Sequence, residues 1–142
     1  MNIDIVTKSK KWDSKEKLVE KIAKKILPLT KAKAHELSIS LVSDAQMKKI
    51  NLQFRGKNKP TNVLSFPGID QFFLGDIVIA FETLEREAKE QKKSFNDHLT
   101  HLILHSILHL LGHDHEEEKE AQKMEKLEIK ILRQLEIANP YK

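Results

Sequence analysis

The seven histidines of this 142-residue chain are unevenly placed, because six of them lie within residues 98–115. Cysteine is absent, so histidine and carboxylate are the side chains that remain to bind a transition metal. His105 and His109 are four residues apart and therefore stand one turn apart on the same face of a helix. Both imidazoles can then reach one ion. The first chemistry that the sequence suggests is metal binding.

A third ligand is expected just beyond this pair. Gly112 can adopt the left-handed conformation that ends a helix, which lets the chain turn back so that His115 approaches the same ion. The pattern H-x-x-x-H-x-x-G-x-x-H, formed by His105, His109, Gly112 and His115, has the spacing of the metzincin zinc motif. Three protein ligands leave the fourth position of a tetrahedral zinc open for water, as in catalytic sites. We therefore predict one Zn²⁺ per chain.

The helix that carries these histidines is otherwise apolar. At 100° per residue its four histidines fall within about 80° of one another, and leucine and isoleucine fill the rest of the circumference. Such a helix is buried on nearly all sides, so we expect the imidazole stripe to line an internal cleft. The trio His101, His105 and His109 spans roughly 12 Å along the axis, too extended for tight tetrahedral ligation. We expect His98 and His101 to be hydrogen-bonded core residues or to support the ligands from behind.

The residue after the first ligand argues against a protease. Zinc proteases place a general-base glutamate there, and this chain has Ser106, which cannot perform that task. Zinc lowers the pKa of its water toward 7 and polarises phosphoryl oxygens, so phosphodiester cleavage needs less help from a carboxylate. Arg55 lies in a loop-like basic segment with Lys57 and Lys59. Because guanidinium binds phosphate bidentately, Arg55 is the candidate catalytic clamp, and an arginine on a surface turn is the alternative.

The surrounding pattern predicts alternating strands and helices, with helices dominating the second half. Alternating apolar residues indicate strands near 3–7, 37–42, 62–66 and 74–81, and helical spacing indicates helices near 14–27, 43–56, 82–92, 96–111 and 116–137. Pro28 is expected to end the first helix. With no repeat or flexible linker, residues 1–142 are expected to form a single α+β domain with a sheet of about four strands.

Charge and hydropathy limit the possible partners and location. The net charge is +4, but residues 1–33 hold ten lysines and four acidic residues, or +6, which leaves −2 for the remainder. A basic end fits a polyanionic partner, and a solvated helix face explains it equally well and is favoured. No apolar run approaches the roughly 18 residues of a membrane span, so we expect a cytoplasmic protein.

Three segments resemble the YbeY family of endoribonucleases. They are LQFRGKNKPTNVLSFP at 52–67, LGDIVI at 74–79 and HSILHLLGHDH at 105–115. The family comprises metal-dependent bacterial ribonucleases that are specific for single strands and linked to ribosomal RNA maturation and ribosome quality control. The resemblance covers nearly the whole chain in length and order. One departure is visible: His113 stands where the family often has tyrosine, so a fourth imidazole could compete for the metal.

The resemblance implies specific roles and partners. It makes His105, His109 and His115 zinc ligands and Arg55 the functional arginine, in agreement with the chemical argument. It also implies a mixed four-stranded sheet with a central metal-binding helix, and as partners single-stranded RNA, above all ribosomal RNA, and ribosome-associated proteins. The open alternatives are a zinc peptidase with an unrecognised base and a non-catalytic ribosome factor with structural zinc. Roles for Ser65, Asp76, His113 and Asp114, as cleft or as turn residues, stay undecided.

Overall fold

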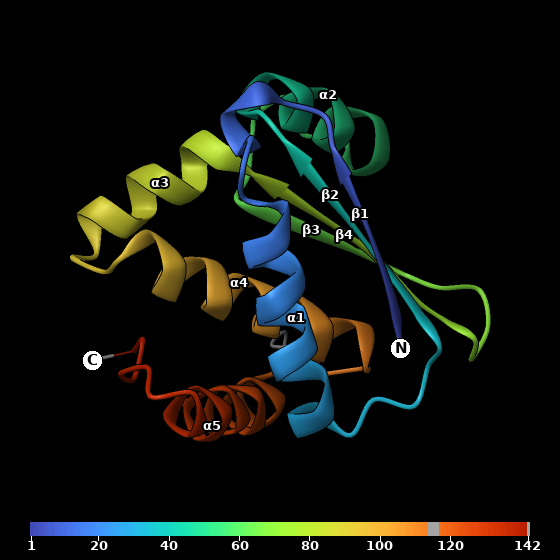
Figure 1. Ribbon diagram of the computed structural model, residues 1–142, viewed down its shortest axis with the longest axis vertical. Coiled ribbons are helices and arrows are strands. Elements are labelled where there is room, and N and C mark those ends of the chain that lie inside the picture. Colours follow the sequence, from blue (N-terminus) through green and yellow to red (C-terminus); the bar gives the residue numbers. More distant parts are fainter. Residues whose placement is uncertain (114–116, 142) are drawn as a thin grey trace.

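The computed structural model describes residues 1–113 and 117–141. These residues form a mixed four-stranded sheet with helices packed around it (Figure 1). The expected α+β fold is therefore confirmed. In chain order the elements are β1 (Asn2–Thr7), a 3-10 turn (Lys10–Trp12), α1 (Glu16–Thr30), β2 (Glu36–Val42), α2 (Asp44–Arg55), β3 (Val63–Pro67), β4 (Phe73–Ala80), α3 (Phe81–Glu90), α4 (Phe95–Leu110) and α5 (Glu118–Gln134).

The sheet has the strand order β1-β2-β4-β3. β1 pairs with β2 in parallel, and β2 pairs with β4 in parallel. β3 and β4 run antiparallel, with Ser65 opposite Ile77. Parallel neighbours need a crossover connection, and α1 supplies the first, between β1 and β2, while α2 lies within the second. This order leaves β3, the strand that follows α2 and Arg55 in the chain, at one edge of the sheet.

Alternation along β4 divides the core between the two faces of the sheet. Ile77 and Ile79 belong to the larger apolar core, which they share with residues of α1, α4 and α5. Val78 and Ala80 point to the other face and pack with Met47 of α2 in a smaller core. Successive strand residues face opposite sides, so one strand holds α2 on one face and the α1, α4 and α5 layer on the other (Figure 1).

Helix α4 is the central helix of the larger layer. It packs against α1, α3, α5 and the edge strand β3. Its N-terminus is capped by Ser94, whose hydroxyl accepts from the Asp97 backbone N–H at 3.1 Å. Apolar residues on several sides of the helix, including Leu99, Ile103 and Leu104, are fully buried. The expectation that this helix is buried around most of its circumference is confirmed, and the core thereby fixes the direction of its histidines.

The expectation that Pro28 ends the first helix is wrong, because α1 continues through it to Thr30. A proline inside a helix removes the hydrogen bond to the carbonyl four residues earlier. Here that carbonyl belongs to Lys24, and both Lys24 and Pro28 are exposed, so water can replace the missing donor. The Thr30 hydroxyl also donates to the Leu27 carbonyl at 2.8 Å. One exposed proline in the last turn is therefore tolerated.

Gly75 allows α4 to approach β4 closely. Its φ of +150° is one that other residues rarely adopt. A Cβ atom at this position would lie 2.4 Å from the Phe66 carbonyl oxygen and 2.7 Å from Cδ2 of Leu110, the last residue of α4. The absence of a side chain at Gly75 thus sets the distance between the sheet and the histidine-bearing end of α4.

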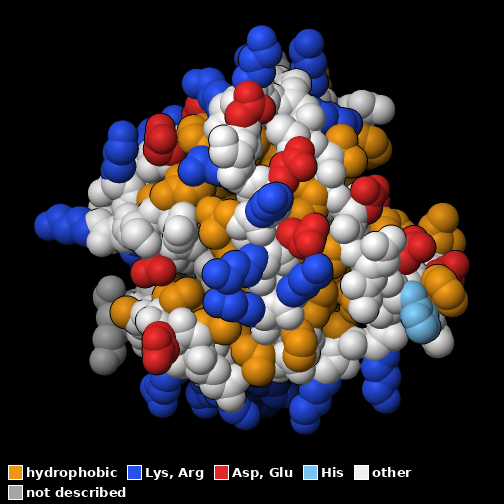
Figure 2. Space-filling model, viewed as in Figure 1, with side chains coloured by type: hydrophobic (Ala, Val, Ile, Leu, Met, Phe, Trp, Pro, Cys, Tyr) orange, Lys and Arg blue, Asp and Glu red, His pale blue; other side chains and the backbone are white. Residues whose placement is uncertain are grey.

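Several lysines of the basic N-terminal segment, residues 1–33, lie on the exposed surface of α1. Lys17, Lys21 and Lys24 of α1 are exposed, and Lys24 pairs with Glu20 at 2.9 Å. Figure 2 shows acidic side chains interspersed among Lys and Arg on this face of the molecule. This arrangement agrees with the solvated-helix interpretation of the charge asymmetry. No helix in the described part of the chain combines the length and apolarity needed to cross a membrane.

Candidate metal centre

The histidine stripe of α4 lines a cavity of about 680 Å³. Four histidines of the helix contribute to its wall, and β3, α3 and the C-terminal residues complete it. The other lining residues are Arg55, Asn62, Val63, Leu64, Ser65, Pro67, Glu87, Gln91, Lys93, Leu102, Leu110, Pro140 and Tyr141. The expectation that the imidazoles line an internal cleft is confirmed.

His105 and His109 face one another in this cavity. The two Nε2 atoms are 3.1 Å apart, and the ring centroids are 4.6 Å apart. Two nitrogen ligands of one tetrahedral Zn²⁺, each about 2.0–2.1 Å from the ion, stand about 3.3 Å apart. The observed separation is close to that value. The pair therefore fits the donor arrangement that a zinc ion requires.

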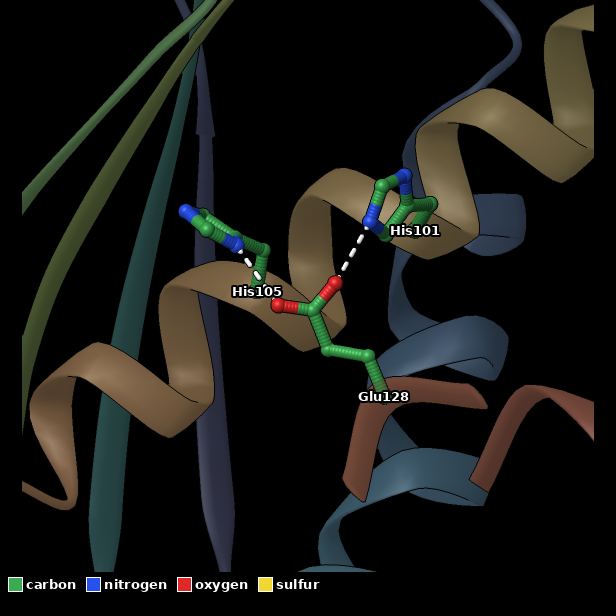
Figure 3. Close-up of side chains that lie close together, drawn as sticks. All are labelled: His101, His105 and Glu128. Carbon is green, nitrogen blue, oxygen red and sulfur yellow. Dashed lines mark hydrogen bonds and ion pairs between the residues drawn. The ribbon is translucent and has the colours of Figure 1, made fainter. Parts of the chain in front are cut away.

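Behind His105 lies a buried carboxylate from α5 (Figure 3). Oε1 of Glu128 is 2.8 Å from Nδ1 of His105, and Oε2 is 2.6 Å from Nε2 of His101. The hydroxyl of Tyr141 also donates to Oε2, at 2.6 Å. Glu128 is fully buried. One carboxylate thus connects two histidines of α4 with the C-terminal segment.

These contacts determine the charge state of Glu128. Burial alone would raise the pKa of this carboxyl group, but the hydrogen bonds from His101, His105 and Tyr141 outweigh it and lower the pKa from 4.5 to about 2. Burial and the Glu128 carboxylate raise the pKa of the Tyr141 hydroxyl above its usual value of 10. At neutral pH Glu128 is therefore an ionised acceptor and Tyr141 is a neutral donor.

Within the described residues, His101, His105 and Glu128 form a group that could hold a metal ion, since one potential ligand atom of each lies within 4.8 Å of the others. Sequence reasoning missed Glu128. A signal was present, because Glu128 occupies the inward stripe of α5 otherwise formed by Met124, Ile131 and Leu132. A single acid in an apolar stripe marks a buried polar contact, although the sequence could not name its partners.

The structure places Arg55 at the rim of the cavity. It is the last residue of α2, which Gly56 caps with φ +69°, so it lies within the helix expected near 43–56 and directly before the loop-like basic residues. Its side chain is exposed and lines both the histidine cavity and a neighbouring cavity of about 320 Å³. Lys57 and Lys59 line that second cavity too. Arg55 thus joins a basic groove to the histidines.

The turn after α4 has the conformation expected for Gly112, whose φ is +99°. The backbone N–H of His113 donates to the Leu108 carbonyl at 3.0 Å, which closes the C-terminal end of the helix. The predicted third ligand, His115, and its neighbour Asp114 lie outside the described residues.

Ser106 is fully buried and is not among the residues that line the cavity. It therefore cannot act on a substrate bound beside His105 and His109. Of the undecided residues, Ser65 lines the cavity from within β3, whereas Asp76 is exposed on β4 and does not line it.

His98, at the start of the stripe, has its own carboxylate partner. Its Nε2 lies 2.9 Å from Oε1 of Glu87, which also accepts from Nδ2 of Asn62 at 3.0 Å. Burial would raise the pKa of Glu87, but the hydrogen bonds from His98 and Asn62 and nearby positive charge lower it overall. His98 is thus a buried, hydrogen-bonded residue, as one of the two interpretations of the sequence predicted.

The sequence matches the family model described as Endoribonuclease YbeY over residues 2–136. A protein of Chelativorans sp. named Endoribonuclease YbeY is 54% identical over 112 residues, which cover 74% of this chain and 69% of that protein. A Bartonella bacilliformis protein of the same name is 45% identical over an alignment of 154 residues, which covers 99% of this chain and 97% of that protein. The chain therefore belongs to the YbeY endoribonuclease family.

A solved structure agrees with this assignment. The solution structure of a Thermotoga maritima protein matches with a TM-score of 0.65 and 29% sequence identity, over 94% of this chain and 91% of that one. Family membership confirms the class of protein expected from the sequence, an enzyme of the nuclease type.

Proposed function

We propose that this protein is a zinc-dependent endoribonuclease that cleaves single-stranded RNA and acts in ribosomal RNA maturation and ribosome quality control, together with ribosome-associated proteins. One observation carries the proposal. The Nε2 atoms of His105 and His109 face each other at 3.1 Å, close to the distance between two nitrogen ligands of one zinc ion, in a cavity with Arg55 at its rim. Membership in a family described as endoribonucleases supports the substrate class.

In this proposal His105, His109 and His115 hold one Zn²⁺. Bound there, zinc would lower the pKa of a water molecule and polarise a phosphoryl oxygen. The imidazoles supply neutral nitrogen ligands, and α4 holds two of them rigidly because its other sides are packed in the core. The group formed by His101, His105 and Glu128 is the competing ligand set. The Nε2 contact with His109 favours the first assignment, because it lies on the side of the His105 ring away from Glu128.

Arg55 binds and orients the substrate in this proposal. Its guanidinium can hold two phosphate oxygens at once and neutralise charge that develops during cleavage. The two cavities share three lining residues, Arg55, Asn62 and Glu87. They therefore give an RNA strand a continuous path past Arg55. A flexible single strand can follow such a path, whereas an A-form duplex presents its phosphates on a broad, rigid cylinder.

Cleavage of matched substrates tests the proposal. Purified wild-type protein should cut single-stranded RNA, spare duplex RNA and a casein-like peptide, and lose activity on chelation. The same preparation of His109→Ala should be inactive, which excludes a contaminating nuclease. Peptide cleavage that depends on His109, with RNA untouched, would instead indicate a zinc peptidase. Zinc binding without cleavage of any substrate would indicate a structural metal site.

A further inference from the structure

Glu128 is an unusual residue for its position. It is fully buried on the inward stripe of α5, between Met124 and Leu132. Its ion pairs in the described part of the chain are with histidines only, and no lysine or arginine balances it. Burying a carboxylate is costly, and a well-packed apolar residue is often at least as stabilising at such a position. Stability alone therefore gives a poor account of Glu128.

The hydrogen bonds of Glu128 specify how two imidazoles are oriented. Two imidazoles and the Tyr141 hydroxyl surround the two oxygens of Glu128. In this arrangement the carboxylate is the common acceptor, so Nδ1 of His105 carries the proton in their 2.8 Å contact. A neutral imidazole protonated at Nδ1 has its lone pair on Nε2. That is the atom of His105 that faces Nε2 of His109. The contact with Glu128 thus selects the form of His105 that can bind a metal on the His109 side.

His101 is held in the opposite orientation. Its Nε2, not its Nδ1, lies against the carboxylate, at 2.6 Å, and must donate to it. A protonated nitrogen has no lone pair for a metal ion. The same carboxylate therefore directs Nε2 of His105 toward His109 and keeps Nε2 of His101 away from the ion. Figure 3 shows Glu128 between the two rings, with one oxygen directed at each.

We propose that Glu128 is a positioning residue for the metal centre, which fixes His105 in its Nδ1–H tautomer and withholds His101 from the metal. This inference rests on the proposed zinc site at His105, His109 and His115. Carboxylates that orient metal-bound histidines typically contribute about 10- to 100-fold to metal affinity. Tyr141 also helps to anchor the carboxylate, but it donates to Oε2, the oxygen that faces His101 rather than His105, and so should matter less.

The first test is made on metal-free wild-type protein at mildly alkaline pH. Long-range ¹H–¹⁵N NMR spectra should show His105 protonated at Nδ1 and His101 protonated at Nε2. A His105 ring protonated mainly at Nε2 would overturn the proposal. Since no metal is present and no substrate is needed, this result does not depend on the proposed nuclease activity.

The second test measures zinc affinity by competition with a chromophoric chelator. Glu128→Gln and Glu128→Leu should bind Zn²⁺ about 10- to 100-fold more weakly than wild type, while urea unfolding of metal-free Glu128→Leu stays close to wild type. The matched control is Glu125→Gln, which makes the same change at an exposed position one turn earlier on α5. Tyr141→Phe should lose less than Glu128→Gln.

The outcomes separate the two proposals. Wild-type zinc affinity in both Glu128 variants would overturn the positioning role even if RNA is cleaved. A wild-type protein that binds no zinc would overturn the proposed function. The NMR measurement of the His105 and His101 tautomers would still test whether Glu128 orients the two rings. If either variant fails to fold, the wild-type NMR spectrum alone decides the matter.

Discussion

Nε2 of His105 lies 3.1 Å from Nε2 of His109, one helical turn further along α4. The other nitrogen of the same His105 ring lies 2.8 Å from the buried carboxylate of Glu128. His105 therefore lies between His109, its partner in the proposed metal site, and the carboxylate of Glu128. Because α4 is packed on its other sides, the core fixes the direction in which both imidazoles leave the helix.

Arg55→Ala should retain the fold and the zinc but lose RNA cleavage by about a hundredfold or more. The side chain is exposed at the cavity rim, so its removal leaves no hole in the core. Steady-state kinetics on single-stranded RNA, with zinc content measured on the same sample, provides the check. Arg55→Lys should rescue poorly because lysine lacks the planar fork. Turnover by Arg55→Ala at the wild-type rate would remove this residue from the mechanism.

Gly75→Ala should lower the free energy of unfolding by about 2 kcal/mol or more, because the new methyl group meets the Phe66 carbonyl and Leu110 in a strained backbone conformation. Urea denaturation measures the effect. Gly56→Ala is the matched control, since its φ is also positive, at +69°, but nothing lies within 4 Å of the added Cβ. It should cost about 1 kcal/mol. Equal losses in the two variants would contradict the close approach of α4 to β4.

The contact between Glu87 and His98 should make stability depend on pH. The pKa of Glu87 is lowered below 4.5 in the folded protein, because the hydrogen bonds from His98 and Asn62 outweigh the effect of burial. A carboxyl group with a depressed folded pKa stabilises the fold at any pH above its unfolded pKa. This contribution is lost as the pH falls from about 4.5 through the folded value.

Glu87→Gln should therefore be less stable than wild type near neutral pH, by about 1–3 kcal/mol for a hydrogen-bonded charged group. The difference should shrink as the pH falls below 4.5. Urea denaturation at a series of pH values measures it. Glu90→Gln, an exposed position on the same helix, should show no such change. A wild-type advantage that grows in acid would reverse the assigned direction of the shift.

Local periodicity predicted the elements of this fold well, because each depends on residues close in sequence. The α4 stripe is an example: the spacing of His105 and His109 fixes a shared face, and the apolar residues around it fix burial. The partner of His105 could not be predicted in the same way. Glu128 is 23 residues away on α5, and its position against α4 depends on how the two helices pack.

Two local details also escaped the sequence pattern. Arg55 was grouped with a loop-like basic segment although the helix expected near 43–56 includes it and it ends α2, because the basic residues that follow Gly56 look continuous with it in composition. Pro28 was expected to end α1, but its exposed position lets the helix continue through its last turn. In both cases the boundary depends on solvent exposure and on one cap, which residue type alone does not determine.

The most direct test of the metal site is the zinc content of two histidine variants measured side by side. His109 belongs to the proposed ligand set, whereas His101 belongs to the competing group with Glu128. After equilibration with equimolar Zn²⁺ and removal of free metal, His109→Ala should have lost its zinc and His101→Ala should retain most of it. Full zinc in His109→Ala together with loss in His101→Ala would contradict the account and place the metal between His101, His105 and Glu128.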